Sequence, residues 1–173
     1  MLNYLKNNYW PGITTSPANA WKVSTLVTIP YIIAALLIGF TVGLFELSML
    51  ESNLVWVMPF ALFIFPSLLE ESIFRGLLIP RDALERGTKY VVFIVLLSSL
   101  IFVAWHPLNA LTINPGAKEI FLNPYFLFVA FLLGITTGIS YIYSKSLWAP
   151  VIIHWLTVVV WVIFLGGRNL VLE

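Results

Sequence analysis

The chain has 173 residues, of which 60% are hydrophobic and 10% are charged, and its mean hydropathy is +0.96. Soluble domains carry roughly 25% charged residues, so the composition excludes a soluble globular protein and indicates an integral membrane protein. The net charge of +1, without basic clusters, argues against a nucleic-acid partner, and the absence of cysteine excludes disulfides, thiolate metal sites and cysteine nucleophiles.

The amino-terminal residues 1–22 are polar and aromatic, include two prolines and lack the pattern of a cleavable signal peptide. We predict that this segment lies at the membrane interface, with Tyr9, Trp10 and Trp21 at the depth of the lipid headgroups. The alternative is a partly disordered tail. Residues 23–173 are predicted to form a single transmembrane helical domain.

Five stretches are long and apolar enough to cross the hydrocarbon core, which requires about 20 residues per helix. They cover approximately residues 23–45, 54–79, 90–106, 125–143 and 148–165. Helices are expected because open sheets cannot satisfy their backbone groups in lipid. The sequence therefore predicts an all-α polytopic transmembrane bundle, with kinks at Pro30, Pro59 and Pro66.

The distribution of lysine and arginine predicts the orientation in the membrane. If the amino terminus is cytoplasmic, Lys118 and Arg168 are the two basic residues that face the exterior. Six basic residues then face the cytoplasm: Lys6, Lys22, Arg81, Arg86, Lys89 and Lys145. This asymmetry favours a cytoplasmic amino terminus. We predict a multi-pass protein of a prokaryotic plasma membrane.

The second apolar stretch contains three charged residues, Glu70, Glu71 and Arg75. Each would cost about 2.5–3.5 kcal/mol at the bilayer centre if it faced lipid. Glu71 and Arg75 are four residues apart with the acid first, so we predict an ion pair on one helix face. Glu70 points about 100° away around the helix. It therefore needs another partner, and intramembrane acids are functional candidates.

The two histidines, His106 and His154, lie in or at the edge of predicted spans. A hairpin that turns near Gly87 brings Glu70 and His106 to heights that agree within roughly 3 Å. Glu70 would lie roughly 15 Å and His154 roughly 9 Å deep from the same side. We predict one polar cavity, open toward the cytoplasm, lined by these three side chains. The alternative is that each histidine is a hydrogen-bonded packing residue.

This residue set supports two kinds of chemistry. The chain lacks a G-x-S-x-G elbow and has no aspartate within a span, so serine and aspartyl mechanisms lose support. Glu70 could act as general base on a water while the histidines stabilise the oxyanion. Alternatively, the glutamate and histidines could bind zinc that activates the water. The H-E-x-x-H spacing is absent, and the residues alone leave both routes open.

Three motifs occur in order: EESIFRG at 70–76, FVAWH at 102–106 and SLWAPVIIHW at 146–155. Over about residues 58–165 the chain resembles the CAAX prenyl protease and bacteriocin-processing (Abi) family of intramembrane glutamic endopeptidases. The resemblance implies hydrolysis of a membrane-anchored or lipidated peptide without a cofactor, zinc being a second possibility.

The same resemblance implies a role for each motif residue. Glu70 would activate the attacking water, while Glu71 and Arg75 would hold the first motif in place. Phe102 opens the second motif, whose His106 would hydrogen-bond the water or Glu70. His154, in the third motif, would stabilise the oxyanion.

The chain departs from the family at Val158, where the third motif usually has Asn or Asp four residues after the histidine. Loss of one oxyanion donor costs on the order of 10²–10³ in turnover, and Thr157 or Asn109 are the candidates to replace it. An alternative is a non-catalytic binding or scaffold relative that uses the same cavity. A third class is a small transporter with Glu70 as proton relay. The sequence does not specify the natural substrate or the oligomeric state.

Overall fold

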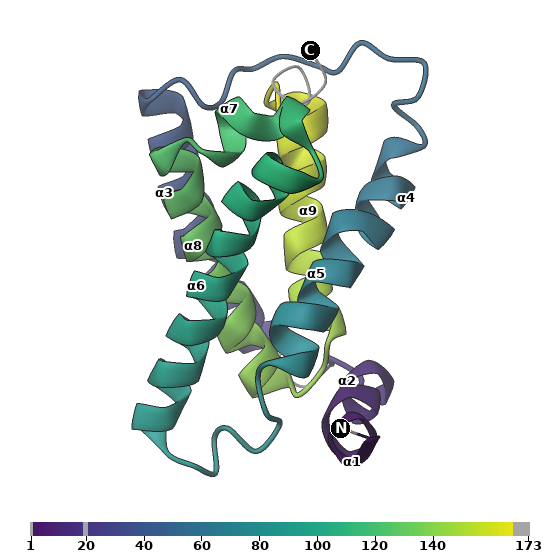
Figure 1. Cartoon of the computed structure of the whole chain (residues 1–173), viewed down its shortest axis with the longest axis vertical. Coiled ribbons are helices and arrows are strands. Elements are labelled where there is room, and N and C mark those ends of the chain that lie inside the picture. The colour runs from purple at the N-terminus through teal and green to yellow at the C-terminus, as the bar shows by residue number, and fades with distance from the viewer. Residues whose placement is uncertain (1, 19–20, 168–173) are drawn as a thin grey trace.

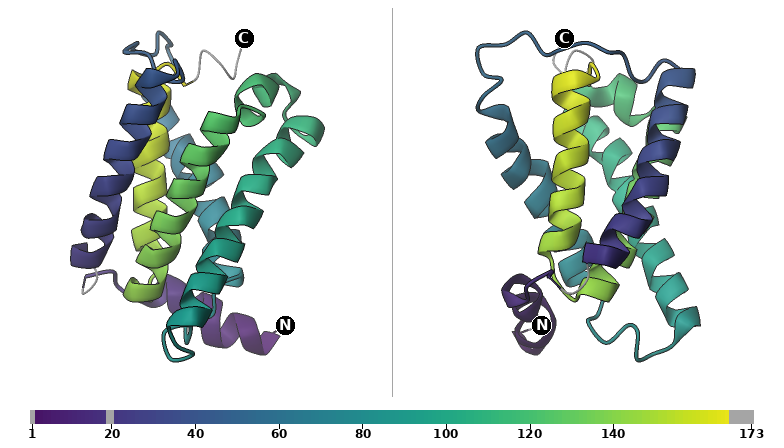
Figure 2. Two further views of the ribbon diagram at one scale, coloured as in Figure 1. Left: turned by 90° about the vertical axis from the view of Figure 1, so that its left-hand side faces the viewer. Right: turned by 180° about the vertical axis from the view of Figure 1, so that it is seen from behind.

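The fold is a bundle of long helices that stand side by side, seen in a computed structural model (Figures 1 and 2). The structure describes residues 2–18 and 21–167. Apart from one isolated bridge between Ser48 and Leu165, the regular structure of these residues is helical. The predicted all-α polytopic bundle is confirmed. The predictions for residues 168–173, including the exterior charge Arg168, lie outside the described residues.

Four of the predicted spans are single helices: α3 (Trp21–Thr41), α6 (Thr88–Thr112), α8 (Pro124–Ser144) and α9 (Trp148–Phe164). Within the described residues, α3, α6 and α8 are long and apolar enough to cross a membrane, and α9 is a shorter apolar helix of 17 residues. Helix α6 continues past His106, the predicted end of the third span. The prediction was based on hydropathy, but the Leu and Ala residues that follow favour helix.

The second predicted span is broken into four pieces: α4 (Met58–Leu62), η2 (Phe63–Leu68), α5 (Leu69–Glu71) and η3 (Ser72–Leu77). The break lies at Phe65, whose φ of −134° and ψ of 118° are not helical and which precedes Pro66. The predicted kink at Pro66 is therefore confirmed. The prediction of a kink at Pro59 is wrong. Pro59 lies in the first turn of α4, where a helix does not need the N–H that proline lacks. Helix α3 continues through Pro30 to Thr41.

Helix α8 is the centre of the bundle and packs against α3, α6 and α9. Its start is fixed by the Asn123 side chain, which accepts a hydrogen bond of 2.9 Å from the Tyr125 N–H. A Cβ atom at Gly134 would lie 3.0 Å from the Ser99 Cβ of α6. Glycine therefore allows the two helices to approach closely. This contact brings the backbone of α8 within reach of side chains from other helices.

The connection of residues 42–57 crosses from α3 to α4 at one end of the bundle (Figure 1). It is attached to the end of α9, because the Ser48 N–H donates to Phe164 O (3.2 Å) and the Leu50 N–H donates to Ile163 O (2.8 Å). At the same end, η4 (Pro115–Ala117) and α7 (Lys118–Phe121) connect α6 to α8. These connections hold the helix ends that surround the cavity described below.

The amino-terminal segment consists of α1 (Leu2–Tyr4), η1 (Leu5–Tyr9) and α2 (Trp10–Thr14) and lies at the opposite end (Figure 2). It is tied to the turn before α9, because the Leu147 N–H donates to Gly12 O at 2.8 Å. Tyr9 packs against Gly76 of η3, whereas Trp10 is 59% exposed. Its position at the membrane interface, and a domain boundary at residue 22, stay predictions.

Candidate active site

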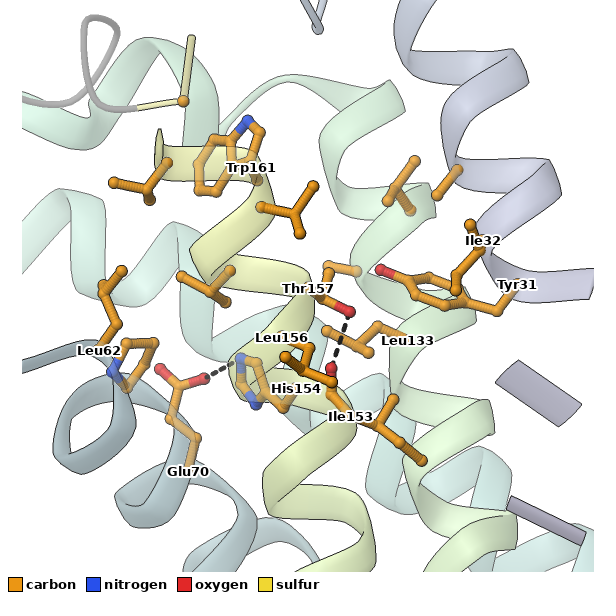
Figure 3. A pocket seen from close by; sticks show the side chains of 18 of the residues that line it. Tyr31, Ile32, Leu62, Glu70, Leu133, Ile153, His154, Leu156, Thr157 and Trp161 are labelled. Carbon is orange, nitrogen blue, oxygen red and sulfur yellow. Dashed lines mark hydrogen bonds and ion pairs between the residues drawn. The ribbon is translucent and has the colours of Figure 1, made fainter. Parts of the chain in front are cut away.

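A cavity of about 860 Å³ lies inside the bundle, between α3, α6, α8, α9 and the broken second span. Its lining is largely apolar (Figure 3). Six of the predicted site residues line it: Glu70, Phe102, His106, Asn109, His154 and Thr157. The segments that carry them are far apart in the sequence, so the fold brings these side chains to one space.

Glu70 is the acid that faces this cavity, and its side chain is held on both sides. It lies on α5 and is 7% exposed. Its Oε1 accepts a hydrogen bond from the Trp105 indole N–H on α6 at 3.1 Å. Its Oε2 lies 3.9 Å from Nε2 of His154 (Figure 3). This distance is longer than a hydrogen bond, so Oε2 keeps its capacity to accept one.

Glu71 and Arg75 point away from solvent and are both fully buried. Glu71 Oε2 lies 3.1 Å from Arg75 Nε, so the ion pair predicted from their spacing is present. Arg75 Nη2 also donates to the carbonyl of Gly134 (3.1 Å) and to the hydroxyl of Thr137 (2.5 Å), both on α8. The guanidinium is therefore anchored to the central helix and is not shared with Glu70.

His154 connects the two glutamates. Its Nδ1 lies 2.9 Å from Glu71 Oε1. An ionised carboxylate can only accept a hydrogen bond, so the Nδ1–H of His154 donates to Glu71. This leaves Nε2 directed toward Glu70. Glu71 thus orients the imidazole with one oxygen and binds Arg75 with the other.

Phe102 lies between the two imidazoles and is fully buried. Its ring centroid is 4.9 Å from that of His106 and 5.7 Å from that of His154, and the Arg75 guanidinium lies 4.7 Å from it. The Nδ1–H of His106 donates to the Phe102 carbonyl at 3.0 Å, which leaves Nε2 of His106 free to accept. His106 and Glu70 line the same cavity, but no hydrogen bond or ion pair joins them among the described residues.

The candidates for the missing amide differ in their surroundings. The Thr157 hydroxyl donates to the carbonyl of Ile153 on its own helix at 2.9 Å (Figure 3). Asn109, on α6, is 6% exposed, and its Oδ1 has no hydrogen-bond partner among the described residues. Val158 itself lines the cavity and packs in an apolar cluster with Leu62. Asn109 is therefore the better placed of the two candidates to bind a ligand.

Two residues of the site were missed in the sequence. Trp105 binds Glu70, and the signal available was its position next to His106 in the second motif. Tyr31 of α3 is 4% exposed, lines the cavity, and its hydroxyl points toward Thr157 (Figure 3). It lies outside the recognised motifs, and nothing local distinguishes it from a lipid-facing tyrosine.

No group of three or more His, Asp or Glu side chains within residues 2–18 and 21–167 has the arrangement of a metal-binding set. Arg75, the two glutamates and His154 form a chain of contacts, from Arg75 through Glu71 and His154 to Glu70. This chain orients the imidazole and the acid toward the cavity. Such an arrangement is suited to moving protons at a bound molecule.

Comparison with protein families places the candidate site within a matched region. The family described as Type II CAAX prenyl endopeptidase Rce1-like matches residues 51–160, which is more than half of the chain. The matched region contains Glu70, His106 and His154 and excludes α3. No curated protein and no solved structure matches the chain.

Proposed function

This chain belongs to the Rce1-like family of type II CAAX prenyl endopeptidases, and from this we propose that it hydrolyses a peptide bond within the membrane. The substrate would be a membrane-associated or prenylated peptide, and Glu70 would activate the water. The observation that carries the proposal is the difference between two neighbouring acids. Glu71 is fully engaged by Arg75 and His154, whereas Glu70 faces the cavity and its Oε2 accepts no hydrogen bond, lying 3.9 Å from His154 Nε2.

In the proposed reaction, Glu70 Oε2 takes a proton from a water molecule in the cavity. The water oxygen forms a bond to the carbonyl carbon of the scissile peptide, and the carbonyl electron pair moves to its oxygen. When the tetrahedral intermediate collapses, the C–N bond breaks and Glu70 returns its proton to the leaving nitrogen. A general base placed in this way contributes about 10²–10⁴ in rate.

His154 is proposed to stabilise the oxyanion through Nε2. Because its Nδ1–H already donates to Glu71, Nε2 can donate only when the ring is protonated. The charges of Glu70 and Glu71 would then balance those of Arg75 and His154. His106, through Nε2, is proposed to orient the water.

The amide usually supplied by the third motif is replaced here by Val158, and we propose that Asn109 takes its role. Its side chain is buried and lines the cavity, and its Nδ2–H makes no hydrogen bond among the described residues, so that this donor is available to an oxyanion. Thr157 is the weaker candidate because its proton is donated to its own helix. Asn109→Ala should reduce turnover more than Thr157→Val, and the reverse order would reject this assignment.

The test is proteolysis by the purified, membrane-reconstituted protein on a mixed library of prenylated and plain peptides, followed by mass spectrometry. We expect cleavage by the wild-type chain and a loss of at least about 10²-fold in Glu70→Gln. Glu51→Gln, the same change at an exposed loop residue, is the matched control. Strong chelators should leave the activity intact, because the proposed route needs no metal.

Other outcomes would identify the alternatives. Loss of activity with a chelator and recovery with zinc would replace the glutamate route by a metal route. The scaffold alternative is favoured specifically by Val158, and peptide binding without cleavage, unchanged in Glu70→Gln, would establish it. Cleavage that persists in Glu70→Gln would reject the assigned base.

We propose a prokaryotic plasma membrane as the location and, on the basis of the lysine and arginine distribution, a cytoplasmic amino terminus. The natural absence of cysteine allows this orientation to be tested with single introduced cysteines. Arg86→Cys should react with a membrane-impermeant thiol reagent only after the membrane is permeabilised, because this residue is proposed to face the cytoplasm. Lys118→Cys should react with the same reagent in intact cells. The opposite labelling pattern would show that the orientation is the reverse of the proposed one.

A further inference from the structure

Trp105 contacts the acid to which we assign the chemistry, although the indole itself bears no reactive group. We propose that Trp105 is a positioning residue that fixes Glu70 and selects Oε2 as the oxygen that takes the proton. The inference rests on the proposed function. It adds a residue that acts through Glu70.

The geometry divides the two oxygens of Glu70 between different neighbours. The indole N–H occupies Oε1 at 3.1 Å, and Oε2 lies 3.9 Å from Nε2 of His154. The other charged groups near Glu70 are Glu71 and Arg75, and these are paired with each other. Among the described residues, the indole therefore supplies the hydrogen bond that defines which way the carboxylate faces.

An indole suits this task because it only donates and does not titrate. It can hold Oε1 without competing for the proton that Oε2 receives. The bond also joins α6 to α5, and the next residue of α6 is His106. A single helix thus carries both the anchor of the base and the imidazole proposed to orient the water, which fixes their relative position.

The chain contains a closely matched indole. Trp155 follows His154, as Trp105 precedes His106, and its N–H also bridges to the broken second span. Its acceptor, however, is the backbone carbonyl of Pro59 at 2.7 Å. Replacing each tryptophan by phenylalanine removes one indole N–H beside one site histidine. Only the change at position 105 frees a carboxylate.

The experiment measures kcat and KM across pH for wild type, Trp105→Phe and Trp155→Phe, with thermal unfolding of each. For Trp105→Phe we expect kcat to fall about 10- to 100-fold, the size for a lost hydrogen bond to a charged group, with KM within about twofold because the indole acts on the base. The acid limb of the kcat profile should move to higher pH, because a carboxylate that loses a donor is harder to ionise. Trp155→Phe should leave kcat within about threefold, since its bond is structural.

A second variant guards against misfolding. Replacing Trp105 by 3-benzothienylalanine keeps the bicyclic shape and removes the N–H, so it should reproduce the loss of kcat with an unchanged unfolding temperature. Wild-type kcat and an unshifted pH profile in both Trp105 variants, while cleavage still depends on Glu70, would overturn this inference alone. Absence of cleavage by the wild-type protein, or cleavage independent of Glu70, would overturn the proposed function and this inference together.

Discussion

Glu70 and Glu71 are neighbours in the chain but belong to two different regions of the molecule. Glu71 lies in a buried network, where Arg75 and His154 occupy its oxygens and α8 holds the arginine. Glu70 lies on the wall of the cavity, where a neutral indole holds one oxygen and the other faces an imidazole across 3.9 Å. A helical step of about 100° separates the two environments.

This difference separates structural from chemical roles. A buried charge with all its partners stabilises the fold only as part of the set, and removal of one partner leaves the others uncompensated. A charge on a cavity wall contributes less to the fold and keeps capacity for a ligand. Substitutions in the buried network should therefore lower stability first, and substitutions at the cavity wall should lower activity first.

The largest expected effect on stability is at Arg75. Arg75→Ala leaves Glu71 buried without its cation, which should cost about 3–5 kcal/mol in the free energy of unfolding. The measurement is thermal or denaturant unfolding of the purified protein in detergent. Glu70→Gln is the contrast and should change the unfolding free energy by less than about 1 kcal/mol. Equal destabilisation by the two changes would remove the distinction between the two regions.

A second test asks whether the network depends on α8. Thr137→Val removes the hydroxyl that accepts from Arg75 Nη2 at 2.5 Å, which should cost about 1.5–3 kcal/mol, as for a hydrogen bond to a charged group. Thr136→Val is the matched control, because the Thr136 hydroxyl donates to Leu132 O of its own helix. The same unfolding measurement applies. If the control is as destabilised as Thr137→Val, the arginine bond contributes nothing specific.

The sequence predicted the features that depend on local spacing and on the rise of a helix along the chain. Hydropathy located the helices of the bundle, and the i,i+4 spacing predicted the ion pair of Glu71 and Arg75. Hairpin arithmetic anticipated that Glu70 and His106 would border the same cavity. The catalytic roles of these residues stay predictions.

The remaining features depend on contacts between segments that are distant in the chain. The sequence does not reveal that Gly134 and Thr137 bind Arg75, because that requires the rotation of α8 relative to η3. It likewise misses the bond between Trp105 and Glu70, since the hairpin estimate gives height but not the direction of an indole. The break at Phe65 also exceeds the simple kink expected from Pro66.

The smallest expected effect concerns the close approach of α8 to α6, which lies directly beside the buried network. A Cβ at Gly134 would meet the Ser99 Cα at 3.2 Å, and backbone cannot move aside easily, whereas at Gly138 it would meet a Val95 methyl at 3.3 Å. Overpacking costs about 1–3 kcal/mol, and the change from Gly to Ala in a helix returns about 1 kcal/mol. Gly134→Ala should therefore destabilise by about 1 kcal/mol, while Gly138→Ala stays near zero. Unfolding of both variants in one detergent measures the difference, and a loss confined to Gly138→Ala would mean that the network does not depend on this helix contact.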